Sequence, residues 1–198
     1  MTVGKQLVIK FFKTKNIEAR HFPKGVEGDK ADFELYIEDH LFGYCQLKSM
    51  LDYEFYGENQ DPAYDTIQAK IHEAANQLKS VNSGHAKPNI VFFINHNREK
   101  GWQDLWYVLT GQEMPPTQAT APIDLGYLKR LLKKGDSEVI DYFIWADTFG
   151  KRISFSINAE SRFNAKLRET ISSKASEEIN IDGQKIPETK RTGKGEDA

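Results

Sequence analysis

Apolar residues recur three and four positions apart in two stretches of the chain, residues 3–15 and residues 64–83. Lysines separate them in the first stretch, and the second continues for about five helical turns. Because this spacing gathers apolar side chains along one side of a helix, both stretches predict amphipathic helices. The dipeptide Asp61-Pro62 precedes the second stretch and is typical of a helix start.

Side chains alternate between two faces in two segments, residues 31–38 and residues 42–50, which a short link connects. Such alternation is typical of half-buried strands, and the short link predicts an antiparallel hairpin. With the turn centred near His40, Asp32 is expected opposite Lys48 on the neighbouring strand.

The face of the hairpin that carries Asp32 also receives polar groups from the second strand. Gln46 and Lys48 are two positions apart and therefore point the same way, and Glu34 is expected opposite Gln46. This face is expected to be partly covered, because it also receives apolar residues. These are Phe42, Tyr44 and Met50.

The run NIVFFINH at residues 89–96 is densely apolar and predicts a central buried strand. Together with the helix at 64–83 it completes a strand–helix–strand crossover in a mixed sheet. Further elements are expected as a helix at 101–111, a basic helix at 127–135, two strands joined by TFGK at 141–157 and a helix at 159–171.

The chain of 198 residues predicts one domain at residues 1–171, followed by a polar tail at 172–198. Apolar residues make up 39% of the chain and aromatic residues 12%, which is typical of a globular protein. The tail has few apolar residues and no helical period, and it is expected to be disordered.

The charge and cysteine content exclude several classes of protein. The net charge of -2 counts against a protein that coats DNA through a general positive field, although a local basic cleft is compatible with it. The single cysteine, Cys45, excludes an intramolecular disulfide and a multi-cysteine zinc site. Neither a signal peptide nor a membrane-spanning stretch is evident, so a cytoplasmic protein without membrane contact is expected.

The polar face of the hairpin combines residue types that suit phosphodiester cleavage. Asp32 supplies a carboxylate, Gln46 an amide oxygen and Leu47 a backbone carbonyl, all of which are oxygen ligands that Mg²⁺ accepts. Lys48 on the same face can contact the phosphate and stabilise developing negative charge. An ordinary cross-strand ion pair between Asp32 and Lys48 on a solvated face is the alternative interpretation.

These residues resemble the motif of the PD-(D/E)xK nuclease superfamily, which has the restriction-endonuclease-like fold. The matching residues are Asp32 in KADFEL and the pair Gln46 and Lys48 in CQLKS. The resemblance covers residues 3–96, with residues 97–171 as an elaboration. It implies an α/β fold whose core is a helix, a three-stranded antiparallel meander, a crossover helix and a further strand, with helices flanking a mixed central sheet.

The resemblance also implies a function, namely a hydrolase acting as an endonuclease with Mg²⁺ or Mn²⁺, on DNA rather than RNA. Asp32, Gln46 and the Leu47 carbonyl would hold the metal, and Lys48 would act at the phosphate. Gln46 replaces the usual acid, as in a known Q-x-K variant of the superfamily. The first helix contains no glutamate, which makes Glu34 a further candidate ligand.

Two further groups of residues are candidates for supporting roles. Glu73 and Gln77, four positions apart on the helix at 64–83, could reach the site, although a solvated helix face also explains them. The basic run Lys129, Arg130, Lys133 and Lys134 could bind a nucleic-acid backbone, and a solvated face is again the alternative.

The sequence supports two classes of function. One is a nuclease active in defence or mobile-element biology. The other is a catalytically silent protein with the nuclease fold that binds nucleic acid or a protein partner. For either class, a second copy of the chain is a further candidate partner. An unrelated α/β domain with a structural Asp32–Lys48 pair is a third interpretation.

Overall fold

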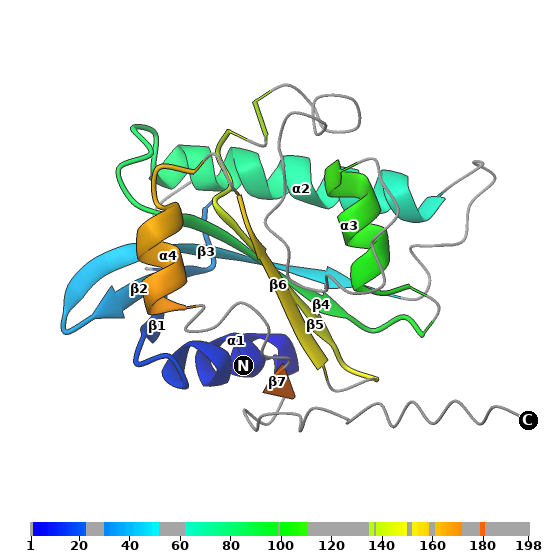
Figure 1. Ribbon diagram of the computed structural model, residues 1–198, viewed down its shortest axis with the longest axis horizontal. Coiled ribbons are helices and arrows are strands. Elements are labelled where there is room, and N and C mark those ends of the chain that lie inside the picture. The colour runs from blue at the N-terminus through cyan, green and yellow to red at the C-terminus, as the bar shows by residue number, and fades with distance from the viewer. Residues whose placement is uncertain are drawn as a thin grey trace, which may run out of the picture.

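The helices of the computed structural model lie on both faces of one seven-stranded sheet (Figure 1). The structure describes residues 2–22, 30–51, 62–98, 100–110, 135–136, 138–149, 152–158, 161–171 and 179–180. The helices are α1 (Val3–Lys13), α2 (Pro62–Val81), α3 (Trp102–Thr110) and α4 (Asn164–Thr170). The strands are β1 (Glu18–His21), β2 (Phe33–Ile37), β3 (His40–Met50), β4 (Asn89–Asn95), β5 (Tyr142–Asp147), β6 (Arg152–Ile157) and β7 (Ile179–Asn180).

The strands follow one another across the sheet in chain order. The pairs β1–β2 and β2–β3 are antiparallel, β3–β4 and β4–β5 are parallel, and β5–β6 and β6–β7 are antiparallel. The parallel pair β3–β4 requires a crossover connection, which α2 provides. The predicted α/β class, with a mixed central sheet flanked by helices, is therefore confirmed.

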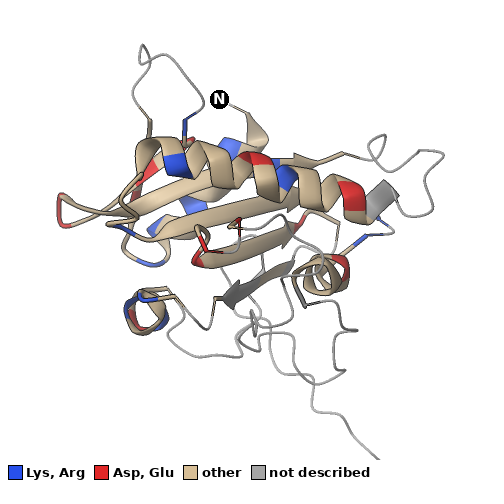
Figure 2. Cartoon of the chain, turned by 90° about the horizontal axis from the view of Figure 1, so that it is seen from above, with Lys and Arg blue, Asp and Glu red and all other residues tan. Residues whose placement is uncertain are grey.

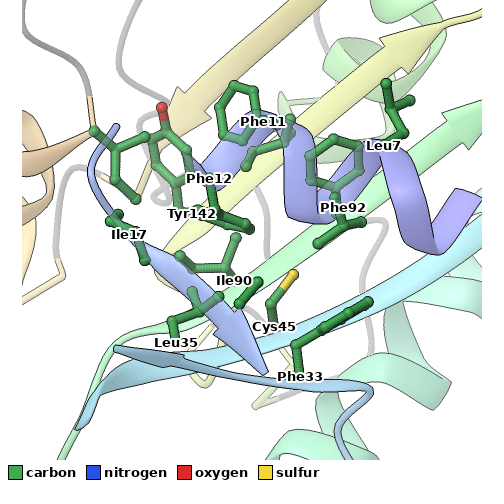
Figure 3. Packing of buried hydrophobic residues seen from close by; sticks show 14 of the residues in the cluster. Leu7, Phe11, Phe12, Ile17, Phe33, Leu35, Cys45, Ile90, Phe92 and Tyr142 are labelled. Carbon is green, nitrogen blue, oxygen red and sulfur yellow. The ribbon is translucent and has the colours of Figure 1, made fainter. Parts of the chain in front are cut away.

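One face of the sheet carries a core formed with α1 and α4. Phe11 of α1 and Phe92 of β4 meet edge to face with their ring centroids 5.5 Å apart (Figure 3). Cys45 of β3 is fully buried in the same core. Burial raises the pKa of the Cys45 thiol well above its usual value, so this side chain serves as core packing rather than as a nucleophile.

The opposite face carries a second core formed with α2 and α3 (Figure 1). The helical spacing seen in the sequence accounts for it, because the apolar side of α2 faces Val91 and Phe93 of β4. The fully buried residues that α2 contributes are Ile67, Ile71, Ala74, Ala75 and Leu78. The sheet is thus covered on both faces, as its fully buried central strand β4 requires.

The register of the β2–β3 hairpin differs from the prediction. The turn is formed by Glu38 and Asp39, both with positive φ (47° and 62°), and not by residues around His40. A two-residue turn of this kind matches the twist of the strands. Glu34 consequently faces Tyr44. The expected pairings of Asp32 with Lys48 and of Glu34 with Gln46 are wrong by two positions, a shift that leaves the faces unchanged.

A β-bulge reverses one side chain that was expected on the polar face. Leu35 pairs with Gly43 but the next residue, Tyr36, pairs with Leu41, which leaves Phe42 without a partner in the ladder. Phe42 therefore packs in the same core as Cys45. Its expected position beside Tyr44 and Met50, which do contact the α2 core, is wrong.

Apart from the basic helix at 127–135, the other predicted elements lie within a few residues of those observed, and the last helix is shorter than expected, spanning Asn164–Thr170. Residues 127–134 lie outside the described residues. Of the tail at 172–198 the structure describes only Ile179–Asn180, which form β7. None of the helices in the described ranges has the length and apolar character needed to cross a bilayer. The expected cytoplasmic location stays a prediction.

The loop before β4 lies so close to Gly43 of β3 that no side chain fits at this position. A Cβ atom at this position would lie 2.6 Å from the carbonyl oxygen of Pro88, which also accepts a hydrogen bond from the Tyr44 N–H at 2.9 Å. Since the clash involves backbone, we expect Gly43→Ala to lower the free energy of unfolding by about 1–3 kcal/mol in chemical denaturation.

Gly84→Ala is the matched control, because no atom lies within 4 Å of a Cβ added there. Its free energy of unfolding should stay within about 0.5 kcal/mol of the parent. Equal stability of the two variants would show that the contact with Pro88 does not constrain β3.

Candidate functional site

Asp32 lies where β2 begins and β3 continues beyond it. The last paired residue of β3 on this side is Cys45, opposite Phe33, so residues 46–50 extend past the start of β2. The Asp32 carboxylate takes the place of the missing strand, because its Oδ2 accepts a hydrogen bond from the Leu47 backbone N–H at 3.0 Å. The side chain is thereby held at the edge of β3, in a position defined by the ladder.

Gln46 completes the contact with the same carboxylate oxygen. Its Nε2 donates to Asp32 Oδ2 at 2.7 Å, and the residue is only 4% exposed. Its Oε1 is buried and has no hydrogen-bond partner within the described part of the chain. The opposite orientation of the amide would place Oε1 against the carboxylate, so the observed one is electrostatically preferred. Buried acceptors are normally paired, so a hydrogen-bond donor or a cation next to this oxygen would stabilise it.

Lys48 points to the same face as Gln46 and toward α2. Its Nζ lies 2.7 Å from Glu73 Oε1 and donates to Gln77 Oε1 at 2.8 Å. The side chain is 7% exposed, whereas that of Glu73 is 59% exposed. Burial lowers the pKa of Lys48 below the ordinary lysine value, and the Glu73 carboxylate partly offsets this effect.

The structure thus brings the two α2 residues that the sequence singled out to Lys48. Their spacing of four positions places both on the side of α2 that faces the end of β3. Acidic and basic residues alternate along α2, so the helix presents no uniformly basic surface (Figure 2). The interpretation of Glu73 and Gln77 as a merely solvated face does not account for their contacts with Lys48.

Lys5 of α1 is a member of the site that the sequence did not indicate. Its Nζ lies 3.7 Å from Asp32 Oδ1, and its side chain is 36% exposed. The preceding Gly4 allows α1 to approach the sheet, because a Cβ there would lie 2.9 Å from Ile94 Cδ1 and 3.4 Å from Leu47 Cδ2. This close contact is a tertiary one, so no local sequence pattern indicates that Lys5 lies near the strand ends.

Glu34, the further candidate ligand, is hydrogen-bonded to another residue of β2. Its carboxylate accepts a hydrogen bond from the Tyr36 hydroxyl at 2.9 Å, and the Arg20 guanidinium lies 4.2 Å from the centroid of that tyrosine ring. The Glu34 carboxylate is therefore hydrogen-bonded to Tyr36, and its role as a metal ligand stays a prediction. The basic run Lys129, Arg130, Lys133 and Lys134 lies outside the described residues.

The oxygen atoms near Asp32 are of the chemical types that Mg²⁺ accepts as ligands. The Leu47 carbonyl points to the same side of β3 as the Leu47 N–H, as strand geometry dictates, and hence toward Asp32. Asp32, the unpartnered Gln46 Oε1 and this carbonyl would together supply a single negative charge, and Mg²⁺ retains several waters in sites of that kind. Within the described ranges, no group of three or more histidine, cysteine, aspartate or glutamate side chains is arranged to hold a metal ion.

The chain was compared with models of protein families, with curated proteins and with solved structures. It matches none of them.

The contact between Lys48 and Glu73 predicts how the lysine titrates. In Glu73→Gln the burial of Lys48 remains while the carboxylate that favours its charged form is gone, so the pKa of Lys48 should fall further below the ordinary lysine value. An NMR titration of the Lys48 side chain measures this shift. Because Glu73 is exposed, we expect the free energy of unfolding at neutral pH to fall by about 1 kcal/mol or less.

Glu169→Gln, which neutralises an exposed glutamate on α4, is the control and should leave the Lys48 titration unchanged.

The folded-state pKa of Lys48 lies below its unfolded value, so the unfolded chain binds more protons between the two values. Stability from this group should therefore rise with pH across that interval, and more steeply in Glu73→Gln. An unchanged Lys48 pKa in Glu73→Gln would contradict the ion pair.

Proposed function

We propose that the protein is a metal-dependent nuclease that hydrolyses phosphodiester bonds, in DNA rather than RNA. The proposal rests on three groups that lie near the end of β3. They are a carboxylate, a buried amide whose oxygen has no partner among the described residues, and a buried ammonium. These groups come from Asp32, Gln46 and Lys48, the three residues of the PD-(D/E)xK-like motif.

The order of elements supports the same proposal. Along the chain α1, the antiparallel meander β1–β2–β3, the crossover helix α2 and the parallel strand β4 follow one another. This is the order expected of a restriction-endonuclease-like core over residues 3–96. The motif residues lie on β2 and β3, or next to them, as that core requires.

Each residue has a separate role in the proposed hydrolysis. A Mg²⁺ or Mn²⁺ ion held by Asp32, Gln46 Oε1 and the Leu47 carbonyl would polarise the phosphate and lower the pKa of a bound water. The Lys48 ammonium donates a hydrogen bond to a phosphate oxygen and stabilises the negative charge that develops there. Glu73 and Gln77 act as positioning residues, because they orient that ammonium.

A catalytically silent protein with this fold is the second candidate function. It is favoured by the pairing of Asp32 with Lys5 and of Lys48 with Glu73, which leaves little surplus negative charge for a metal. Such a protein would bind nucleic acid or a protein partner. A purely structural Asp32–Lys48 pair has less support, since each of the two residues has another ionic partner.

Nucleic acid would require a positively charged surface near this site. The residues predicted for it, Lys129, Arg130, Lys133 and Lys134, lie outside the described part of the chain, and their role stays a prediction. The same holds for a function in defence or mobile-element biology.

The proposed activity is tested with the purified chain, Mg²⁺ or Mn²⁺, and supercoiled DNA, linear DNA and RNA. We expect divalent-dependent cleavage of DNA, lowered at least about 100-fold by Asp32→Asn and by Lys48→Ala. Cleavage is measured by gel electrophoresis, and thermal denaturation verifies that the variants are folded.

Lys13→Ala is the matched control, because it removes an exposed lysine at the end of α1 and should leave cleavage unchanged. Absence of cleavage with every substrate and both metals would favour the catalytically silent alternative. Cleavage that survives both Asp32→Asn and Lys48→Ala would assign the activity to other residues.

A further inference from the structure

The ammonium of Lys5 on α1 lies 3.7 Å from Asp32 Oδ1. We infer that Lys5 is the resident counter-ion of the candidate metal site: its ammonium is exchanged for the divalent ion at Asp32 and passes to the substrate phosphate. This inference rests on the proposed function, because it concerns the affinity of the same site for metal and for a phosphodiester.

The two carboxylate oxygens of Asp32 have different surroundings. Oδ2 already accepts hydrogen bonds from Gln46 Nε2 at 2.7 Å and from Leu47 N at 3.0 Å. The other oxygen, Oδ1, faces Lys5 Nζ at 3.7 Å. The oxygen with the fewer donors is thus the one next to the ammonium, so a metal ion and Lys5 compete for it.

The Lys5 ion pair is weak enough to be exchanged. A separation of 3.7 Å exceeds that of a direct hydrogen bond, and the Lys5 side chain is 36% exposed. Ion pairs of this kind contribute little in water, and a divalent ion interacts more strongly with a carboxylate than an ammonium does. Lys5 therefore lowers the affinity for metal without blocking the site.

The backbone of α1 keeps Lys5 near the site after the exchange. Gly4 lets the first turn of α1 lie against Ile94 and Leu47, and the buried apolar side of the helix anchors it to the sheet. The displaced ammonium remains within a side-chain length of Asp32. An anion that arrives next to the metal is its natural new partner, and the phosphodiester is that anion.

The charge balance makes metal and substrate depend on each other. Asp32 and Lys5 together are neutral, and a divalent ion added to them leaves two positive charges. A phosphodiester supplies a negative charge and accepts the displaced ammonium. Metal should therefore bind more tightly when the phosphodiester is present, and by linkage the reverse holds as well.

The test compares Mn²⁺ binding to the full chain and to three variants by isothermal titration calorimetry. Lys5→Met should tighten Mn²⁺ binding roughly two- to five-fold, the factor that corresponds to loss of an exposed ion pair. Lys13→Met is the matched control, with the same change on an exposed residue of the same helix, and should leave the affinity unchanged. Asp32→Asn should abolish the binding, and thermal denaturation verifies that each variant is folded.

The coupling is measured by repeating the titration with a phosphorothioate DNA duplex, which resists hydrolysis. The duplex should raise the Mn²⁺ affinity of the parent chain, and it should do so much less in Lys5→Met. Mn²⁺ binding that is detectable in Lys5→Met but not in the parent would also support the inference.

Two results would overturn the inference, and they differ in what they imply for the proposed function. If the parent binds Mn²⁺ through Asp32 and Lys5→Met binds it equally or less tightly, Lys5 is no competitor, while the proposed function stands. If neither the parent nor Lys5→Met binds Mn²⁺ with or without the duplex, the metal-dependent function fails together with the inference.

Discussion

The unequal pairing of the two edges of β3 is the constraint on which the rest of the structure depends. On one edge β3 pairs with β2 only as far as Cys45, while on the other it pairs with β4 from Tyr44 to Met50. Among the described residues, the second half of β3 therefore has a strand partner on one side and none on the other. Asp32 closes that edge with a side chain. Because a side chain and not a strand fills this place, groups from both faces of the sheet can reach it.

This arrangement explains how opposite charges from two separate helices lie next to one strand. Lys5 approaches Asp32 from α1, and Glu73 meets Lys48 from α2. The two helices cover opposite faces of the sheet (Figure 1). Each charge brought toward the interior has an opposite charge nearby, which limits the cost of desolvation. The same pairing holds the site close to neutral, so any ligand that brings charge must rearrange it.

The parts that could be predicted from the sequence were those set by local periodicity. Alternation separated Cys45 from Gln46 and Lys48, and helical spacing put Glu73 and Gln77 on one side of α2. The hairpin register was missed because Glu38 and Asp39 give a weaker turn signal than the Asn-Gly and Asp-Gly pairs usual in such turns. The bulge that turns Phe42 and the approach of Lys5 depend on tertiary packing, which no local pattern encodes.

The position of Lys5 has an evolutionary consequence. A single base change converts a lysine codon into a glutamate codon, so one mutational step could replace the ammonium beside Asp32 by a second carboxylate. The side chain is partly exposed and the core side of α1 is formed by other residues, so such a change would leave the hydrophobic packing intact. The affinity of this corner of the sheet for cations can therefore be selected for or against almost independently of the fold.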